Sequence, residues 1–458
     1  MAEALAVLGG ARFHDVDEEG LDSGWVVSMS REERLLEAAC LRVKEAVVRV
    51  LDYLCEIVTS WQSDKRYLDA ATLLRILVRR DQGLAGEKYH KAPDLVWAAD
   101  WCTSRFRGWA WVRLSLNLEK LGMYDECLEA LRSACGDSNV RGGDLVEIRD
   151  RLPSKHKKYG DLNDTPPASP FRKDTEERIM VDMDMGKEGN RRSKKGGRLL
   201  FFDKPRRGDD GQVVPTAGRV DAKTGVVVEA VALKKKHESG GWLGRHCESR
   251  GVMFLLMLLL WEDVFDGRVK AACGHCLANR PYDLYDLHFC ARRRGLPGRL
   301  DAIARATDRE LWGDVGERFD RYKGVKCVWC SWREFTKQQT MEIAVSFGGR
   351  RLSYVLKALT RDLPHMHWGF PDLLLWRPKG RTGAVQNGDG GSRRGASEFG
   401  LGWEGEGRGW EVQVVEVKSE NDTLSSVQRA WLSLLRDAGV PAVVTRVIAG
   451  RGGAGQRS

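Results

Sequence analysis

The sequence lacks an apolar segment long enough to cross a membrane. Its longest apolar run, residues 252–261 (VMFLLMLLLW), falls well short of the roughly 20 residues that a transmembrane helix requires. A run of this length, apolar on every side, is typical of a helix buried in a protein core. We therefore expect no membrane partner.

Disulfide bonds are equally poorly supported. The chain has 11 Cys, an odd number, and no secretory leader is recognisable before them, so we expect reduced thiols in an intracellular protein. Two pairs, Cys273 with Cys276 and Cys327 with Cys330, have the internal spacing of a zinc site. The gap between the pairs is longer than in zinc ribbons or fingers, and the second pair lies in the apolar segment VKCVWCSW. We expect no structural zinc.

The charges of the chain are not balanced. Lys and Arg number 74 against 65 Asp and Glu, which gives a net charge of +9 at pH 7. The basic residues also occur in clusters rather than evenly along the chain. This pattern favours a polyanionic partner such as a nucleic acid.

The first part of the chain is predicted to be helical. Residues 1–30 show no sustained period and are expected to be flexible, whereas residues 31–152 repeat apolar side chains at the three- to four-residue spacing of amphipathic helices. Part of this region has the residue types of a tetratricopeptide hairpin, namely Trp111, Leu114, Leu121, Gly122, Tyr124 and Ala130. No second copy follows at a regular interval. We therefore predict an irregular helical-repeat domain.

The rest of the chain is predicted to lead into an α/β nuclease domain. Residues 153–197 are rich in Pro and charge and are expected to form a disordered linker. Residues 198–363 are a mixed region with short β-rich runs at 199–202 and 226–231, followed by the buried core helix. Residues 364–458 show two strands, a helix and a third strand, the core of a restriction-endonuclease-like fold. The Gly- and Arg-rich stretch 379–409 is expected to be a loop insertion at the tip of a hairpin.

This last module carries the residues of a metal-dependent nuclease. Asp372 follows Pro371, and Glu416 and Lys418 flank Val417 near the end of an apolar strand. Alternate residues of a strand point to the same side, so Glu416 and Lys418 share a face that Asp372 can join from a neighbouring strand. Two carboxylates and the Val417 carbonyl suit a hard divalent cation, and Lys418 suits a role at the attacking water or the phosphate. The same short string also fits an exposed strand with an ordinary Glu and Lys pair.

The residues around the string favour the nuclease interpretation. PDLLLW and VVEVKSENDTLSSVQRAWLSLLRDAGV resemble the virus-type replication-repair nuclease domain, whose further motif residues are matched by Asn421, Asp422, Leu424, Ser425, Gln428 and Trp431. Upstream, SRFRGWAWVRLSLNLEKLG, GGRLLFF, GWLGRHCESRGVMFLLMLLLWEDVF and VWCSWREFTKQQTMEIAVSFGGRRLSYVLKAL resemble successive parts of the Fanconi-associated nuclease family. The resemblance extends from about residue 31 to the C-terminus, outside the linker and the Gly-rich insertion.

The resemblance implies a function and a set of site residues. The family consists of structure-selective nucleases of the phosphodiesterase I type, which cut 5′ flaps and digest DNA from a 5′ end with Mg²⁺ or Mn²⁺. Its members act in interstrand cross-link repair, which implies a nuclear protein with possible protein partners of that pathway. Asp372, Glu416, Lys418 and Gln428 then take catalytic roles, and Asp372, Glu416 and Val417 hold the metal.

The resemblance also implies a third carboxylate ligand, Glu248. In the family a Glu within a His-Gly-Glu-Gly segment completes the metal site, and Glu248 occupies the matching position here. Cys247 and Ser249 replace the two glycines of that segment. An ordinary Glu at a helix N-terminus is the alternative. Two further departures, Val427 and Pro364, stand where the family has basic residues that face phosphate.

Candidate DNA contacts are basic residues of the helical domain and of the segment before the core helix. They are Arg105, Arg107, Arg141, Arg149, Arg245 and His246, with Arg151 and Lys234 to Lys236 as further candidates. Each also fits a solvated surface charge. Trp101, Trp109 and Trp111 are interpreted as core residues rather than base-stacking platforms.

The alternative to an active nuclease is a catalytically silent DNA-binding or scaffold protein built on the helical domain. The joint presence of Asp372, Glu416, Lys418 and Gln428 argues against it, because drift would have altered at least one of them. A pure helical adaptor is a third interpretation, and it leaves the C-terminal module unexplained.

Overall fold

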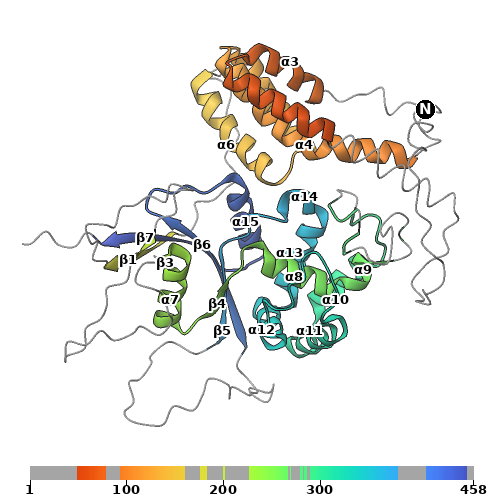
Figure 1. Cartoon of the computed structure of the whole chain (residues 1–458), viewed down its shortest axis with the longest axis vertical. Helices are drawn as coiled ribbons and strands as arrows, with labels where there is room; N and C mark the ends of the chain where they lie inside the picture. Colours follow the sequence, from red (N-terminus) through yellow and green to blue (C-terminus); the bar gives the residue numbers. More distant parts are fainter. Residues whose placement is uncertain are drawn as a thin grey trace, which may run out of the picture.

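The computed structural model consists of a helical region and a larger body built around a mixed sheet (Figure 1). It describes residues 49–78, 93–159, 176–182, 200–201, 226–266, 269, 279–281, 283–285, 289–379 and 409–450. Within these ranges the side chains of residues 93–105, 180–182, 200–201, 226–227 and 449–450 are not described.

The helical region is a set of packed antiparallel helices that ends at residue 159. It contains a helix over residues 49–63, α3 (Tyr67–Val78), α4 (Pro93–Lys120), α5 (Tyr124–Gly136) and α6 (Gly142–Tyr159). Apolar side chains from all of these helices form one buried cluster. The prediction of a helical region is confirmed from residue 49 onward, and its likeness to tetratricopeptide repeats stays a prediction. Residues 1–48, including the start predicted to be flexible, lie outside the described ranges.

The prediction of a disordered linker over residues 153–197 is wrong in two places. Residues 153–159 continue α6, with Pro153 inside the helix. Residues 176–182 form strand β1 (Glu176–Asp182), which pairs with the last strand of the sheet. Both segments are ordered by packing partners far away in the sequence, and local composition does not report such partners. The remaining residues of the predicted linker lie outside the described ranges.

The main sheet has five strands in the order β1-β7-β6-β5-β4. Its other members are β4 (Leu243–His246), β5 (Leu373–Pro378), β6 (Trp410–Ser419) and β7 (Ala442–Gly450). Strands β4, β5 and β6 are antiparallel, whereas β7 runs parallel to β6 and β1 runs parallel to β7. The three predicted strands of the C-terminal module are thus confirmed as β5, β6 and β7, and the intervening helix is α15 (Ser426–Asp437).

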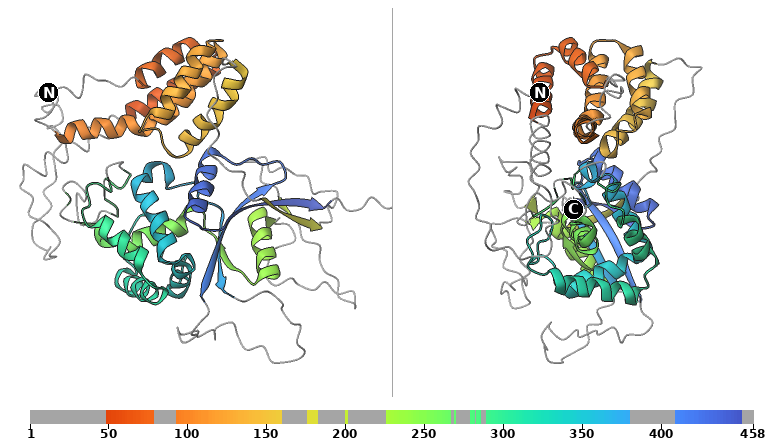
Figure 2. Two further views of the ribbon diagram at one scale, coloured as in Figure 1. Left: turned by 180° about the vertical axis from the view of Figure 1, so that it is seen from behind. Right: turned by 90° about the vertical axis from the view of Figure 1, so that its right-hand side faces the viewer.

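Both faces of the sheet are covered, which explains the continuous apolar sequence of β5. Leu373 and Leu375 pack on one face, in a cluster that includes α7 (Val228–Gly240). Leu374 and Trp376 pack on the other face against a larger helical layer. Figure 2 shows α7 standing on one side of the sheet and the larger helical layer on the other. A strand buried on two sides loses the alternation of apolar and polar residues.

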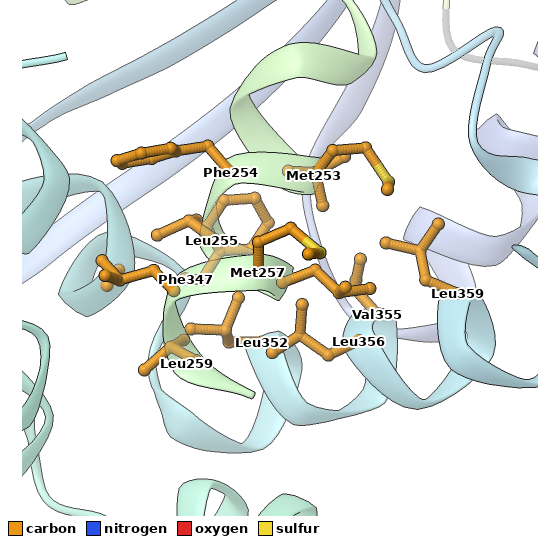
Figure 3. Packing of buried hydrophobic residues seen from close by; sticks show 14 of the residues in the cluster. Met253, Phe254, Leu255, Met257, Leu259, Phe347, Leu352, Val355, Leu356 and Leu359 are labelled. Atoms are coloured by element: carbon orange, nitrogen blue, oxygen red, sulfur yellow. The ribbon is translucent and has the colours of Figure 1, made fainter. Parts of the chain in front are cut away.

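The helical layer is centred on the long apolar run, which forms α8 (Ser249–Leu259) as predicted. Around it lie α9 (Trp261–Val264), α10 (Leu296–Arg305), α11 (Asp308–Tyr322), α12 (Lys337–Phe347), α13 (Gly349–Arg361) and α14 (Leu363–Met366). Figure 3 shows side chains of α8 meeting Leu352, Val355, Leu356 and Leu359 of α13. Every residue from Val252 to Leu260 is at most 2% exposed, because neighbours surround α8 on all sides. No helix among the described residues has the length and apolarity needed to cross a membrane.

The boundary predicted between residues 363 and 364 does not separate two folding units. Strand β4 pairs with β5, and β1 pairs with β7, so segments from before the boundary complete the sheet. A second prediction also changes, because the β-rich run at 226–231 is only partly a strand. Val226–Val227 form β3, which pairs with β2 (Leu200–Phe201), and the chain then enters α7.

The helical region contacts the sheet body through α6. Gly143 lies so close to Val427 at the start of α15 that a Cβ there would meet its side chain at 2.5 Å. Asp150 of α6 forms an ion pair with Arg429 of α15, and Arg141 donates a hydrogen bond to the carbonyl of Arg361 at 3.3 Å. Val427, one of the departures from the family pattern, is thus a buried contact between the two regions.

The Gly-rich insertion leaves and re-enters the sheet at one point. The backbone N–H of Lys379 donates to the carbonyl of Gly409 at 2.7 Å, next to the paired ends of β5 and β6. Residues 380–408 lie outside the described ranges. This hydrogen bond therefore joins the two ends of the insertion where it leaves the hairpin of β5 and β6.

Candidate metal and nuclease site

Asp372 lies where two strands meet at the start of β5. Its Oδ2 accepts a hydrogen bond from the backbone N–H of Val417 at 2.8 Å. Its carbonyl accepts from the backbone N–H groups of Cys247 and Glu248, at 3.1 and 3.3 Å. The residue is thereby held against β6, as predicted for a neighbouring strand, and also against the residues that follow β4.

Glu416 is the most buried charged residue of the site, with no exposed surface. Its Oε1 accepts hydrogen bonds from Lys418 Nζ at 2.9 Å and from Gln428 Nε2 at 2.5 Å. Its Oε2 is buried and has no hydrogen-bond partner. The structure therefore brings together Asp372, Glu416, Lys418 and Gln428, the four residues predicted to be catalytic.

The electrostatics of this group favour a bound cation. Burial raises the pKa of Glu416 to about 8, and the like charge of Asp372 adds to the rise, while Lys418 opposes it. Burial also raises the pKa of Asp372, against the Val417 hydrogen bond and the charge of Lys418. An unpartnered carboxylate oxygen inside such a cluster is costly unless a proton or a cation compensates it. Oxygen donors of this kind fit a hard divalent ion.

Gln428 is held by the start of α15. Its side-chain Oε1 accepts from the backbone N–H of Ser425 at 2.9 Å, and its backbone N–H donates to Ser425 Oγ at 3.2 Å. These two bonds form a capping box at the helix N-terminus. Because Oε1 is committed to the cap, Nε2 is directed at Glu416.

The structure adds a carboxylate that sequence reasoning missed. Glu229, near the start of α7, has a ligand atom within 4.8 Å of those of His246 and Asp372, a grouping that suits a metal ion. The residues VVVEAV around Glu229 were interpreted as β-rich, so nothing local pointed to a site residue. His246 lies beside Asp372, and its predicted contact with DNA stays a prediction.

Glu248 occupies a different position from Glu229. Its side chain is 62% exposed, and its Oε1 lies 3.9 Å from His246 Nε2. Its backbone φ is +46°, a conformation that is strained for residues other than Gly. Glu248 is the residue that directly precedes α8. Glu248 is not part of the compact ligand group found among the described residues. Its assignment as the third carboxylate stays a prediction, as does the role of the Val417 carbonyl.

The structure argues against Arg107 as a DNA contact. Arg107 is 8% exposed, forms an ion pair with Asp137 and donates to the carbonyl of Val78 at 2.7 Å. Trp111 donates to the same Asp137 at 3.0 Å, so it is part of the same core contact. A charge that is buried and paired within one domain is unavailable to phosphate.

The other candidate DNA contacts have varied surroundings. Arg245 of β4 lies over Phe335 and donates to Gln339 at 3.4 Å. Arg149 is half-buried on α6, and Arg151 forms an ion pair with Glu119. Lys236 is buried, and its Nζ lies 2.6 Å from Oε2 of Glu177. The side chains of Trp101 and Arg105 lie outside those that the structure describes. DNA contacts by Arg141, Arg149 and Arg245 stay predictions.

One of the two Cys pairs is described. Cys327 and Cys330 are buried in the helical layer beside α8. A hydrogen bond between the two thiols lowers the pKa of Cys327 and raises that of Cys330. Cys273 and Cys276 lie outside the described ranges, and the expected absence of zinc stays a prediction.

The fold and the site define the class of the domain. The chain order α7, β4, β5, β6, α15 and β7 places Asp372 before β5 and Glu416 and Lys418 at the end of β6, as the resemblance to a virus-type replication-repair nuclease domain implies. A family model described as the VRR-NUC domain matches residues 310–449. This match extends the predicted C-terminal module upstream to α11.

The curated relatives of the chain are Fanconi-associated nucleases. It is 27% identical over 353 residues to the Fanconi-associated nuclease 1 homolog of Arabidopsis thaliana, covering 76% of this chain and 33% of that protein. It is 28% identical over 350 residues to human Fanconi-associated nuclease 1, covering 75% of this chain and 30% of the human protein. The predicted resemblance to this family is confirmed. The chain spans about a third of the length of these relatives.

Solved structures confirm the fold. A crystal structure of paFAN1 bound to a 2-nucleotide 5′ flap DNA with a gap superposes with a TM-score of 0.59 at 16% identity. The alignment covers 97% of this chain and 67% of that chain. The helical region and the mixed-sheet domain thus occur together in a known arrangement.

Proposed function

We propose that the chain is a metal-dependent nuclease that hydrolyses phosphodiester bonds in DNA. The observation that carries this proposal is the buried Oε2 of Glu416, which has no partner and lies beside Asp372 and Lys418. A purely structural Glu at this position would have its second oxygen hydrogen-bonded. A site that keeps a buried acceptor open is arranged to receive a ligand.

Each residue has a role that follows from its contacts. Asp372 and Glu416 would hold the cation, with Glu229 and His246 as further donors at its edge. When bound, the cation would polarise the phosphate and lower the pKa of a water molecule. Lys418 Nζ, whose side chain is 13% exposed, keeps a positive charge where negative charge builds on the phosphate. Gln428 fixes the carboxylate plane of Glu416.

The oxygen-rich donor set favours Mg²⁺ or Mn²⁺ as the metal. Carboxylate oxygens suit both ions, and the nearby imidazole of His246 is better tolerated by Mn²⁺ than by Mg²⁺. We therefore expect activity with both ions and a preference that His246→Gln shifts toward Mg²⁺. Such a shift would be seen in the ratio of cleavage rates with the two metals.

We further propose that the substrates are branched DNA molecules with 5′ flaps or free 5′ ends. The support is the similarity to Fanconi-associated nucleases and the fold shared with a protein crystallised on 5′ flap DNA. By the same similarity we propose a role in interstrand cross-link repair, together with repair partners, in the nucleus. The helical region, fixed to the sheet body through α6 and α15, would bind DNA outside the cleavage site.

A catalytically silent DNA-binding scaffold is the competing function. The test is a cleavage assay with labelled 5′-flap, nicked and blunt DNA, with Mg²⁺, with Mn²⁺ or with EDTA. We expect metal-dependent cleavage of the flap substrate, which Glu416→Gln abolishes. Binding of all three substrates without cleavage under any metal condition would support the scaffold instead.

A further inference from the structure

The outer face of α13 carries a line of positive charge. At about 100° per residue, Arg350, Tyr354, Lys357 and Arg361 fall within a sector about 60° wide, and Arg351 flanks it. All five side chains are exposed, and the helix contains no Asp or Glu. We call Arg350, Arg351, Lys357 and Arg361 the α13 stripe.

Packing of the opposite face of α13 in the core determines which way the stripe faces. The opposite face of α13 is buried, and Leu352, Val355 and Leu356 meet α8 there (Figure 3). Rotation of the helix would expose these residues, so the stripe faces away from the core. Tyr354, 47% exposed, places an aromatic ring and a hydroxyl in the middle of the stripe.

The stripe differs from the other charged helices of this layer because its cations are unpaired. Within the described part of the chain, none of its four side chains forms an ion pair or a hydrogen bond. On α11, by contrast, Arg318 pairs with Asp314 at 2.9 Å and Arg321 pairs with Glu262 at 3.5 Å.

The stripe also opposes the stability of its own helix. Lys357 and Arg361 are four residues apart and their like charges repel each other, although the helix dipole favours Arg361 in the last turn. Arg350 and Arg351 lie in the first turn of α13, where the helix dipole disfavours cations. Folding stability therefore does not explain this arrangement, whereas a polyanion bound along the helix would compensate it.

The C-terminal end of the stripe contacts the helical region. There the carbonyl of Arg361 accepts a hydrogen bond from Arg141, a cation predicted from the sequence to contact DNA. Beyond Arg361 the chain passes through α14 and reaches Asp372. The stripe thus ends where the helical region and the segment that carries Asp372 meet.

We propose that the α13 stripe binds the sugar-phosphate backbone of a duplex arm of the DNA substrate, an inference that rests on the proposed nuclease function. From residue 350 to residue 361 the helix rises about 16 Å, and B-DNA carries one charge per roughly 1.7 Å of its axis. Several phosphates therefore lie within reach of the four cations, and the Tyr354 hydroxyl can donate to another. Contacts of this kind position the duplex without reading its sequence.

The test is DNA binding by the full chain in EDTA, measured by fluorescence anisotropy with labelled 5′-flap DNA over a range of salt concentrations. Lys357→Gln with Arg361→Gln should raise Kd about tenfold. It should also reduce the slope of log K against log salt by about 1.8, because two phosphate contacts are lost. Lys357→Arg with Arg361→Lys retains the charges and should bind like the wild type.

The matched control, Lys323→Gln with Lys326→Gln, removes two exposed cations that follow α11 and have no ion pair among the described residues, and it should change the salt slope little. Equal losses in the two double variants would overturn the proposal in favour of a general charge effect, and so would an unchanged slope in the stripe variant. Thermal melting of each variant controls for misfolding. Because the assay contains no metal, its result is independent of whether the wild type cleaves DNA.

Discussion

Buried charged side chains have opposite surroundings in the helical region and in the sheet body. In the helical region, Arg107 and Asp137 are paired, and Asp137 also accepts from Trp111 and from the backbone of Asn139. These hydrogen bonds outweigh burial and lower the pKa of Asp137. In the sheet body, Glu416 is buried beside the like charge of Asp372, keeps one oxygen unpartnered, and has its pKa raised.

The difference distinguishes a buried charge that stabilises the fold, such as Asp137, from a buried charge that can bind a ligand, such as Glu416. A buried ion pair with every hydrogen bond made has nothing left to bind, and losing one partner destabilises the domain. A cluster of like charges is destabilising until a cation binds to it. Removal of Arg107 should therefore lower stability, whereas removal of the Glu416 charge should raise it.

The largest effect is expected from Glu416→Gln, which should reduce cleavage by about 10³-fold or more, as should Lys418→Ala. DNA binding should stay nearly unchanged, because affinity comes from distributed phosphate contacts. A parallel loss of binding and cleavage in both variants would contradict these roles. Cleavage rates and anisotropy on the same flap substrate measure the two quantities.

The same variant also tests the comparison through pH. The folded-state pKa of Glu416, about 8, lies above the ordinary value of 4.5 for Glu, so its charged form is disfavoured in the folded protein. Its destabilising contribution grows as pH rises from 4.5 and is complete above pH 8. Without metal, Glu416→Gln should therefore raise Tm more at pH 8.5 than at pH 5.

The second prediction concerns the buried ion pair between Arg107 and Asp137 in the helical region. Arg107→Ala leaves Asp137 buried without its counter-charge and should destabilise this region by about 3–5 kcal/mol. Urea unfolding followed by circular dichroism measures the loss, and hydrogen exchange should locate it in α4 and α5. Arg66→Ala is the matched control, because Arg66 and Asp69 form an exposed pair for which about 1 kcal/mol or less is expected. Equal losses in the two variants would remove the contrast.

The third prediction compares the two candidate carboxylates at the edge of the site. Glu229→Gln should weaken metal affinity by about 10- to 100-fold, because Glu229 is grouped with His246 and Asp372. Glu248→Gln should have a smaller effect, because that side chain is mostly exposed. Isothermal titration with Mn²⁺ measures both affinities. The opposite order would return the third-ligand role to Glu248.

A smaller effect is expected at the contact between the two regions. Burial raises the pKa of Asp144 on α6 from 3.8 to about 6, against the charge of His365. Its charged form therefore lowers stability increasingly between pH 3.8 and 6 and fully above that range. Asp144→Asn should stabilise the protein by about 1–2 kcal/mol at pH 7.5 and by little at pH 4. Equal Tm changes at the two pH values would show that charge is not the cause.

The smallest effect is expected from the Gly-rich insertion. Replacing residues 380–408 with an Asn-Gly turn should change stability by less than about 1 kcal/mol, because Lys379 and Gly409 are already joined by a hydrogen bond. Cleavage should be retained. Thermal melting and the flap assay check both expectations, and an insoluble product would show that the insertion supports the fold.

The sequence was sufficient to predict the parts of the fold that rest on local patterns. Strands β5, β6 and β7, helix α15 and the buried helix α8 have clear apolar periods, and alternation along β6 placed Glu416 and Lys418 on one face. Strand β1 was missed because its partner β7 lies more than 250 residues away. An isolated segment of mixed polarity becomes a strand only when such a partner is present.

The missed site residue and the wrong DNA contact have a similar cause. Glu229 lies in a β-branched run that favours a strand, yet packing against Leu373 and Leu375 keeps α7 helical and brings its first turn to Asp372. Arg107 has the same local signature as a phosphate-binding Arg. Its partner Asp137 lies 30 residues away at the C-terminal end of α5, so only the folded structure shows that the charge of Arg107 is already neutralised.

The capping box of α15 restricts which residue types evolution can exchange at position 428. At most helix N-termini Gln and Glu are interchangeable at this position, because either side chain can accept the hydrogen bond from the cap residue. Here the other end of the same amide donates to Glu416. A Glu would keep the helix start intact and place a further negative charge against Glu416 and Asp372. A substitution that is neutral for the helix is therefore excluded at this position by the site that the helix serves.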